Sequence, residues 1–202
     1  MIQVVEANFA TSAQGVDDSL PDGVSEVVFL GRSNVGKSSI INALANKKGL
    51  AKSSSTPGKT RLINFFEIKF MKDKEVFIGR FVDLPGFGYA KVSKSMKNEW
   101  QKNLTNFLKA RSSIRVFVQL IDSRHPHLEI DKDVNDYVKT LLRPDQEIIQ
   151  IFTKSDKLNQ KEKSALKREF PGALLVSSSN KSGINIALEK IFNSIFEAKE
   201  IL

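Results

Sequence analysis

The segment at residues 31–38 constrains the fold of this chain more than any other. It reads Gly-Arg-Ser-Asn-Val-Gly-Lys-Ser and matches the pattern GxxxxGK[ST] in full. An apolar run at residues 27–30 precedes it, and apolar residues at helical spacing follow it. Glycines at these positions let backbone amides approach an anion closely, at the positive end of a helix. The sequence therefore predicts a phosphate-binding loop between a strand and a helix.

Two side chains of this loop have predicted roles in binding. We expect Lys37 to reach the β- and γ-phosphates of a nucleotide, and the Ser38 hydroxyl to ligate Mg²⁺. Further contacts with the nucleotide are predicted for the rest of the loop and the residue after it, namely Gly31, Arg32, Ser33, Asn34, Val35, Gly36 and Ser39.

A second motif, Asp-Leu-Pro-Gly, follows another apolar run. We expect Asp83 to hold Mg²⁺ through water and the Gly86 amide to sense the γ-phosphate, with Leu84 and Pro85 beside the nucleotide. Many switch proteins place a glutamine directly after this glycine, where it orients the attacking water. Here the position holds Phe87, which cannot form that hydrogen bond. Intrinsic hydrolysis is therefore predicted to be slow, and an alternative role for Phe87 is to anchor the loop on the core.

A third motif, at residues 153–156, indicates which base is bound. Two carboxylate oxygens of Asp156 suit the N1–H and the exocyclic amino group of guanine, a donor pair that adenine lacks. The stem of Lys154 would lie along the base plane. Contacts with the nucleotide are also predicted for Thr153 and Ser155, and contacts with the guanine O6 edge for Ser177, Ser178 and Ser179.

A loop at residues 52–61 is the predicted mobile segment. A threonine hydroxyl there should complete the Mg²⁺ shell when the γ-phosphate is present, and both Thr56 and Thr60 qualify.

The chain alternates strand and helix patterns, which predicts an α/β domain with a mostly parallel sheet and helices on both faces. Residues 62–70 and 75–82 are expected to form an antiparallel hairpin, and residues 93–110 a helix. We expect residues 1–24 to pack on a single nucleotide-binding domain at 25–202.

The composition excludes some functions and favours others. The chain has no cysteine and two histidines, so thiol catalysis and cysteine-based metal sites are excluded. A net charge of +8 suggests a polyanionic partner, although a generally lysine-rich surface would give the same value. No signal peptide or membrane-spanning run is evident, so a cytoplasmic protein is expected.

Taken together, GRSNVGKS, TPGKT, DLPGFGYA, DSRHP and TKSDKL resemble the EngB family, also called YihA or YsxC, which is an Era-like group of bacterial GTPases. The resemblance covers nearly the whole chain. It implies a Ras-like three-layer sandwich, a P-loop NTPase fold with a mixed, mostly parallel, six-stranded sheet. It also implies that Thr60 is a Mg²⁺ ligand, that nucleotide contacts extend over Gly58, Lys59, Thr60, Arg61 and Leu62, and that Lys37, Thr60 and Gly86 act in hydrolysis.

The same resemblance implies a role as a monomeric factor in assembly of the large ribosomal subunit, bound through ribosomal RNA, and a requirement in cell division and septation. Related GTPases with asparagine at the position of Asn34 use K⁺, and the alternative is that Asn34 stabilises the loop. Two other functions stay open. One is a P-loop kinase or ATPase, and the other is a nucleotide-gated binding module that acts in division without significant hydrolysis.

Overall fold

The computed structural model describes residues 1–52, 62–87 and 94–197, and only the backbone of residues 94–101. The elements in order are β1 (Gln3–Ala13), β2 (Glu26–Gly31), α1 (Lys37–Leu44), β3 (Ile63–Lys72), β4 (Glu75–Asp83), α2 (Lys94–Ala110), β5 (Ile114–Asp122), α3 (Glu129–Leu141), β6 (Glu147–Thr153), the short 3₁₀ turn η1 (Ser155–Lys157), α4 (Gln160–Glu169), β7 (Leu174–Leu175) and α5 (Ile184–Phe196).

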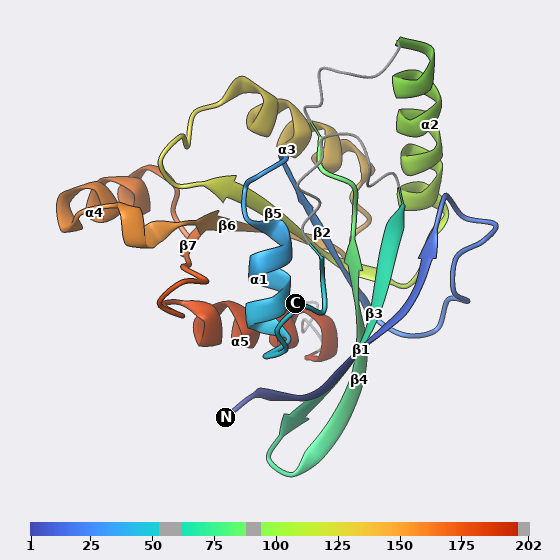
Figure 1. Cartoon of the computed structure of the whole chain (residues 1–202), viewed down its shortest axis with the longest axis horizontal. Helices are drawn as coiled ribbons and strands as arrows, with labels where there is room; N and C mark the ends of the chain where they lie inside the picture. The colour runs from blue at the N-terminus through green and yellow to red at the C-terminus, as the bar shows by residue number, and fades with distance from the viewer. Residues whose placement is uncertain (53–61, 88–93, 198–202) are drawn as a thin grey trace.

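The described strands form one mixed sheet in the order β1-β3-β4-β2-β5-β6-β7 (Figure 1). Strands β4, β2, β5, β6 and β7 run parallel, while β3 is antiparallel to both of its neighbours. The α/β class, the hairpin and the helix after the second motif are confirmed.

The predicted count of six strands is wrong, because the sheet has a seventh, β1, at its edge. It pairs with β3 from Gln3↔Met71 to Ala13↔Ile63, with two register shifts. Only Val4, Ala7 and Ala13 of this strand are buried, so its sequence lacks the alternation that marks a half-buried strand.

Helices cover both faces of the sheet. The buried side chains of α1 and α5 pack with Phe29, Phe70 and Phe81 on one face, while Phe107 of α2 and Val138 of α3 pack on the other. A smaller cluster joins Leu166 of α4 to Ile121 and Phe152 on the ends of β5 and β6. No described helix is long and apolar enough to cross a membrane.

The N-terminal end of β2 contains a buried ion cluster. Glu26 is fully buried and accepts hydrogen bonds from Arg80 at 2.9 Å and from Arg111 at 2.6 and 2.7 Å. A buried carboxylate is tolerated only when its oxygens are satisfied in this way. The cluster fixes the end of the sheet opposite to the strand carboxyl ends, where the three nucleotide motifs lie.

Candidate nucleotide site

The loop at residues 31–38 lies between β2 and α1, where the sequence places it. Gly36 precedes the helix with φ of 99°, and Asn34 also has positive φ, 64°. Such angles favour glycine and, among other residues, asparagine. The first amides of α1 have no acceptor within the helix, and no side chain caps them. They are therefore available to an anion.

Two glycines allow close packing between this loop and the second motif. A Cβ on Gly31 would lie 2.9 Å from a methyl of Val35, and a Cβ on Gly86 would lie 3.2 Å from the amide of Ser33. The Ser33 amide donates to the Phe87 carbonyl at 3.2 Å, and the Phe87 amide donates to the Gly31 carbonyl at 3.3 Å. These bonds join the two motifs into one surface.

Asp83 ends β4 with its side chain buried, and it forms an ion pair with Lys37. Burial raises the pKa of Asp83, while the Lys37 ammonium opposes that rise. Nearby, the Ser38 hydroxyl makes a long 3.4 Å hydrogen bond to the carbonyl of Lys52. Hydroxyl and carboxylate oxygens are the hard donors that Mg²⁺ prefers. The donor set present at Ser38 and Asp83 therefore fits this ion.

The third motif contacts the first. The Thr153 hydroxyl lies 2.7 Å from the carbonyl of Val35 and 3.2 Å from that of Ile121. Lys154, with φ of 57°, reaches the Asn34 carbonyl at 2.8 Å and the Asp122 carboxylate at 2.9 Å. The end of β6 is thus joined to the phosphate-binding loop by hydrogen bonds.

Asp122 is a residue of this site to which the motif reasoning gave no role. It ends β5, is buried, and accepts two side-chain hydrogen bonds from Arg124 at 2.9 and 2.7 Å besides that of Lys154. Burial acts to raise the pKa of Asp122, but these hydrogen bonds outweigh it and hold the pKa well below its ordinary value. The signal in the sequence was an acidic residue at a strand end, directly before an arginine-containing turn.

Asp156 and the serine-rich turn lie together, as the sequence predicts. The Ser177 hydroxyl donates to Asp156 at 2.6 Å and lies 2.9 Å from the Ser179 hydroxyl. The hydrogen bond from Ser177 lowers the pKa of Asp156. Ser155 is buried and donates its amide to Val176, and Ser178 is half-buried. Asp156 is therefore held as a carboxylate, the form that accepts two hydrogen bonds.

The Arg32 side chain pairs with Asp131 of α3 at 3.0 Å. Asp131 is buried, and burial raises its pKa despite the opposing charge of Arg32. The carbonyl of Asp131 also accepts a hydrogen bond from Gln119 of β5 at 2.6 Å. Sequence reasoning missed this link between the loop and α3, because nothing local marks Asp131.

The structure describes some of the remaining predicted site residues and not others. Leu84 and Pro85 are buried next to Asp83, while Ser39 and Leu62 are exposed. The predicted contacts of the mobile segment, Thr56, Gly58, Lys59, Thr60 and Arg61, lie outside the described residues. Among the residues that the structure does describe, no group of three or more His, Cys, Asp or Glu could hold a metal ion.

The fold and the three joined motifs define a P-loop GTPase. Residues 26–154 match the model of a family described as "50S ribosome-binding GTPase". The chain is 57% identical over 190 residues to "Probable GTP-binding protein EngB" of Campylobacter jejuni strain 81-176. The matched residues make up 94% of this chain and 96% of that protein. The protein of the same name from Aliarcobacter butzleri is also 57% identical, over 96% of this chain and 98% of that one. This chain belongs to the EngB family of GTP-binding proteins.

Solved structures agree with this assignment. A crystal structure of a probable GTP-binding protein engB matches with a TM-score of 0.63 and 25% identity, over 86% of this chain and 100% of that chain. Era in complex with MgGDPNP and nucleotides 1506–1542 of 16S ribosomal RNA matches with a TM-score of 0.64, over 90% of this chain and 60% of that one. At 18% identity, the likeness to Era shows the common fold alone.

Proposed function

We propose that this GTPase is a slow molecular switch that acts in assembly of the large ribosomal subunit. The observation that carries the proposal is the contact between the three motifs, in which Thr153 and Lys154 hold the loop that would bind phosphate. A nucleotide bound across these motifs would have its phosphates at the start of α1 and its base at Asp156 and Ser177.

Magnesium would be held by Ser38, Asp83 and, from the segment outside the described residues, Thr60. The ion supplies charge compensation for the β- and γ-phosphates when it is bound. Lys37 would exchange its ion pair with Asp83 for the phosphate oxygens, which releases the carboxylate. The Gly86 amide would contact the γ-phosphate, at the place where Gly86 packs on Ser33.

Slow intrinsic hydrolysis is proposed because Phe87 stands after Gly86. Its ring packs half-buried against the core on the α2 and α3 face, where it anchors the loop and orients no water. The missing contribution to hydrolysis would come from the ribosome or from K⁺ near Asn34. The backbone of Asn34 has a positive φ.

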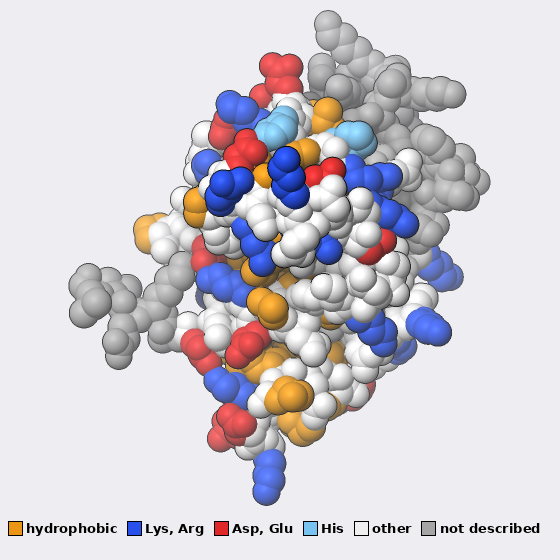
Figure 2. Space-filling view, turned by 90° about the vertical axis from the view of Figure 1, so that its left-hand side faces the viewer, with side chains coloured by type: hydrophobic (Ala, Val, Ile, Leu, Met, Phe, Trp, Pro, Cys, Tyr) orange, Lys and Arg blue, Asp and Glu red, His pale blue; other side chains and the backbone are white. Residues whose placement is uncertain are grey.

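Ribosomal RNA is the proposed polyanionic partner. The family description names ribosome binding, and the net charge of +8 supports it. Exposed lysines follow α1 at Lys47, Lys48 and Lys52, and α4 carries Lys161, Lys167 and Arg168. Figure 2 shows Lys and Arg side chains over the face that includes α4. Binding would fall steeply as salt concentration rises.

The side chains of Lys59, Lys91, Lys94 and Lys97, which are further candidates for RNA contact, lie outside the described part. The protein would act as a monomer in the cytoplasm and would be required for normal division and septation.

Single-turnover GTP hydrolysis with and without purified large subunits tests the proposal. We expect slow turnover alone, faster turnover with subunits, and faster turnover in K⁺ than in Na⁺. Asn34→Ala should remove the difference between the two cations. Equal rates in all conditions would instead favour the second candidate, a nucleotide-gated binding module that acts in division.

A further inference from the structure

Asp122 is a buried residue of the nucleotide site to which the proposed function gives no role. It ends β5, opposite Thr153 in the parallel pairing with β6. Two backbone hydrogen bonds fix the turn that follows. The Ser123 amide donates to the Thr153 carbonyl at 3.0 Å, and the His125 amide donates to the Asp122 carbonyl at 2.9 Å. The Asp122 side chain is therefore held at the edge of the sheet where the nucleotide motifs lie.

Each oxygen of this carboxylate accepts two hydrogen bonds. Oδ1 accepts from the Arg124 amide at 3.1 Å and from Arg124 Nε at 2.9 Å. Oδ2 accepts from Arg124 Nη2 at 2.7 Å and from Lys154 Nζ at 2.9 Å. A carboxylate offers about four lone-pair sites, so these four bonds occupy its acceptor capacity. Any role of Asp122 in ligand binding must therefore act through Arg124 or Lys154.

Lys154 is the partner that reaches the phosphate-binding loop. Its Nζ also donates to the Asn34 carbonyl at 2.8 Å, and a Cβ on Gly36 would lie 3.9 Å from its Cε. The stem of the lysine thus runs along this loop. The backbone of Lys154 has φ of 57°, a left-handed conformation that is uncommon for residues other than glycine and that persists only where the surrounding structure holds it.

The end of the Lys154 side chain is fixed although about 30% of the side chain is exposed. Ordering a lysine costs more rotamer freedom than ordering most other side chains. Two acceptors, the Asn34 carbonyl and the Asp122 carboxylate, hold the ammonium group in the protein without nucleotide. The cost of ordering the stem is therefore met before a ligand binds, which favours affinity.

We propose that Asp122 is a positioning residue for guanine-nucleotide binding. It acts through Lys154, whose ammonium it holds beside the Asn34 carbonyl, so that the lysine stem is in place for the base. This inference rests on the proposed function, because it requires that the stem of Lys154 lies along the guanine. The alternative is that Asp122 only closes its own turn with Arg124, in which case its effect on binding would not depend on Lys154.

A double-mutant cycle between Asp122→Ala and Lys154→Met separates these two roles, with GDP affinity measured by titration with a fluorescent guanine nucleotide. Alone, Asp122→Ala should weaken GDP binding by roughly three- to thirtyfold. Lys154→Met keeps an unbranched stem and removes the ammonium, so in that variant Asp122→Ala should change the affinity by less than about twofold. If Asp122→Ala does not fold, Asp122→Asn takes its place, and its effect should likewise disappear in the methionine variant.

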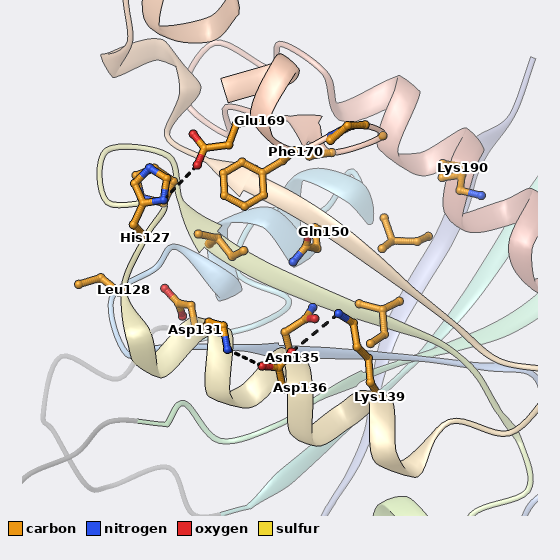
Figure 3. A pocket seen from close by; sticks show the side chains of 18 residues that line it. His127, Leu128, Asp131, Asn135, Asp136, Lys139, Gln150, Glu169, Phe170 and Lys190 are labelled. Atoms are coloured by element: carbon orange, nitrogen blue, oxygen red, sulfur yellow. Dashed lines mark hydrogen bonds and ion pairs between the residues drawn. The ribbon is translucent and has the colours of Figure 1, made fainter. Parts of the chain in front are cut away.

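Asp136→Ala supplies a matched control. Asp136 also lies close to lysines, with Lys132 at 2.8 Å and Lys139 at 3.8 Å, but it is exposed and lines a pocket between α3 and the loop before β7 (Figure 3). The residues that line this pocket do not include any residue of the three motifs. GDP affinity should therefore change by less than about twofold.

Equal effects of Asp122→Ala with and without the Lys154 ammonium would overturn the inference, because Asp122 would then act independently of Lys154. An unchanged or higher GDP affinity in Asp122→Ala alone would also overturn it, as would an equal loss in Asp136→Ala. A parent protein that binds no guanine nucleotide would overturn the proposed function itself. A parent that binds GDP and gives additive effects in the cycle would remove only the role of Asp122.

Discussion

The hydroxyl of Thr153 donates a 2.7 Å hydrogen bond to the carbonyl of Val35, across 118 residues of sequence. The two residues belong to different motifs, one at the end of β6 and the other within the phosphate-binding loop. Many GTPases place asparagine at the position of Thr153. Here the threonine hydroxyl joins the phosphate-binding loop to the end of β6 and so connects the two motifs.

Thr153→Val preserves the shape of this side chain and removes only the donor. The buried Val35 carbonyl would lose its partner, so we expect GDP affinity to fall about two- to tenfold, the equivalent of about 0.5–1.5 kcal/mol. Titration with a fluorescent guanine nucleotide measures this. Thr153→Ser keeps the donor and should bind like the parent. Equal affinity in the valine variant would mean that the bond does not support the loop.

Lys37→Ala should abolish tight binding of both GTP and GDP. The change removes the ammonium group that is predicted to reach the β- and γ-phosphates and leaves Asp83 buried without its ion pair. Isothermal titration gives the affinity, and circular dichroism shows whether the fold survives. A folded variant that binds GTP like the parent would show that Lys37 has no role in binding.

Asp156→Asn should change base selectivity. The asparagine side chain presents one acceptor and one donor group where the carboxylate presents two acceptors. It therefore complements xanthine better than guanine. We expect GTP affinity to fall at least about tenfold and xanthosine triphosphate to become the better ligand. Competition between the two nucleotides measures this change in selectivity, with Lys109→Gln, at an exposed lysine of α2, as the control.

Asp122→Asn should reduce stability in a pH-dependent way. The pKa of Asp122 is depressed in the folded protein, so its contribution is present above the unfolded value of about 3.9 and is lost as pH falls through the folded value. The difference in free energy of unfolding between parent and variant should therefore be large at about pH 7 and shrink below about pH 4. Urea titrations across this range measure it. A difference that stays constant would show that the carboxylate charge is not responsible.

Glu26→Gln should destabilise the fold without touching the nucleotide site. It removes the buried carboxylate that pairs with both Arg80 and Arg111, and Arg111 keeps its ion pair with Asp22 at 3.5 Å, so we expect a loss of about 3–5 kcal/mol, mainly through Arg80. Chemical denaturation measures the loss. The matched change Glu6→Gln, in an exposed ion pair with Lys69, should leave stability unchanged within error. Similar effects of the two changes would contradict a special role for the buried cluster.

Much of the fold was predictable because its signals are local. The apolar runs that became β2, β5 and β6 are buried on both faces, and continuous hydrophobic runs mark such strands. Strand β1 was missed because it has few buried side chains and forms only by pairing with β3. In the same way, Asp131 has ordinary surroundings in sequence, and its partner Arg32 lies 99 residues away. For Asp122 the partner Arg124 is local, but the contact with Lys154 spans 32 residues.

The sequence by itself determined the order of the three motifs that are predicted to bind phosphate, magnesium and the base, and the residue types in each. Those properties depend on residues close together in the chain. Only the tertiary structure decided which groups meet. Examples are the hydrogen bond from Thr153 to Val35, the Arg32–Asp131 ion pair and the short pairing of β6 with β7. Such contacts depend on strand order and register, which arise when distant segments pack and which no local pattern encodes.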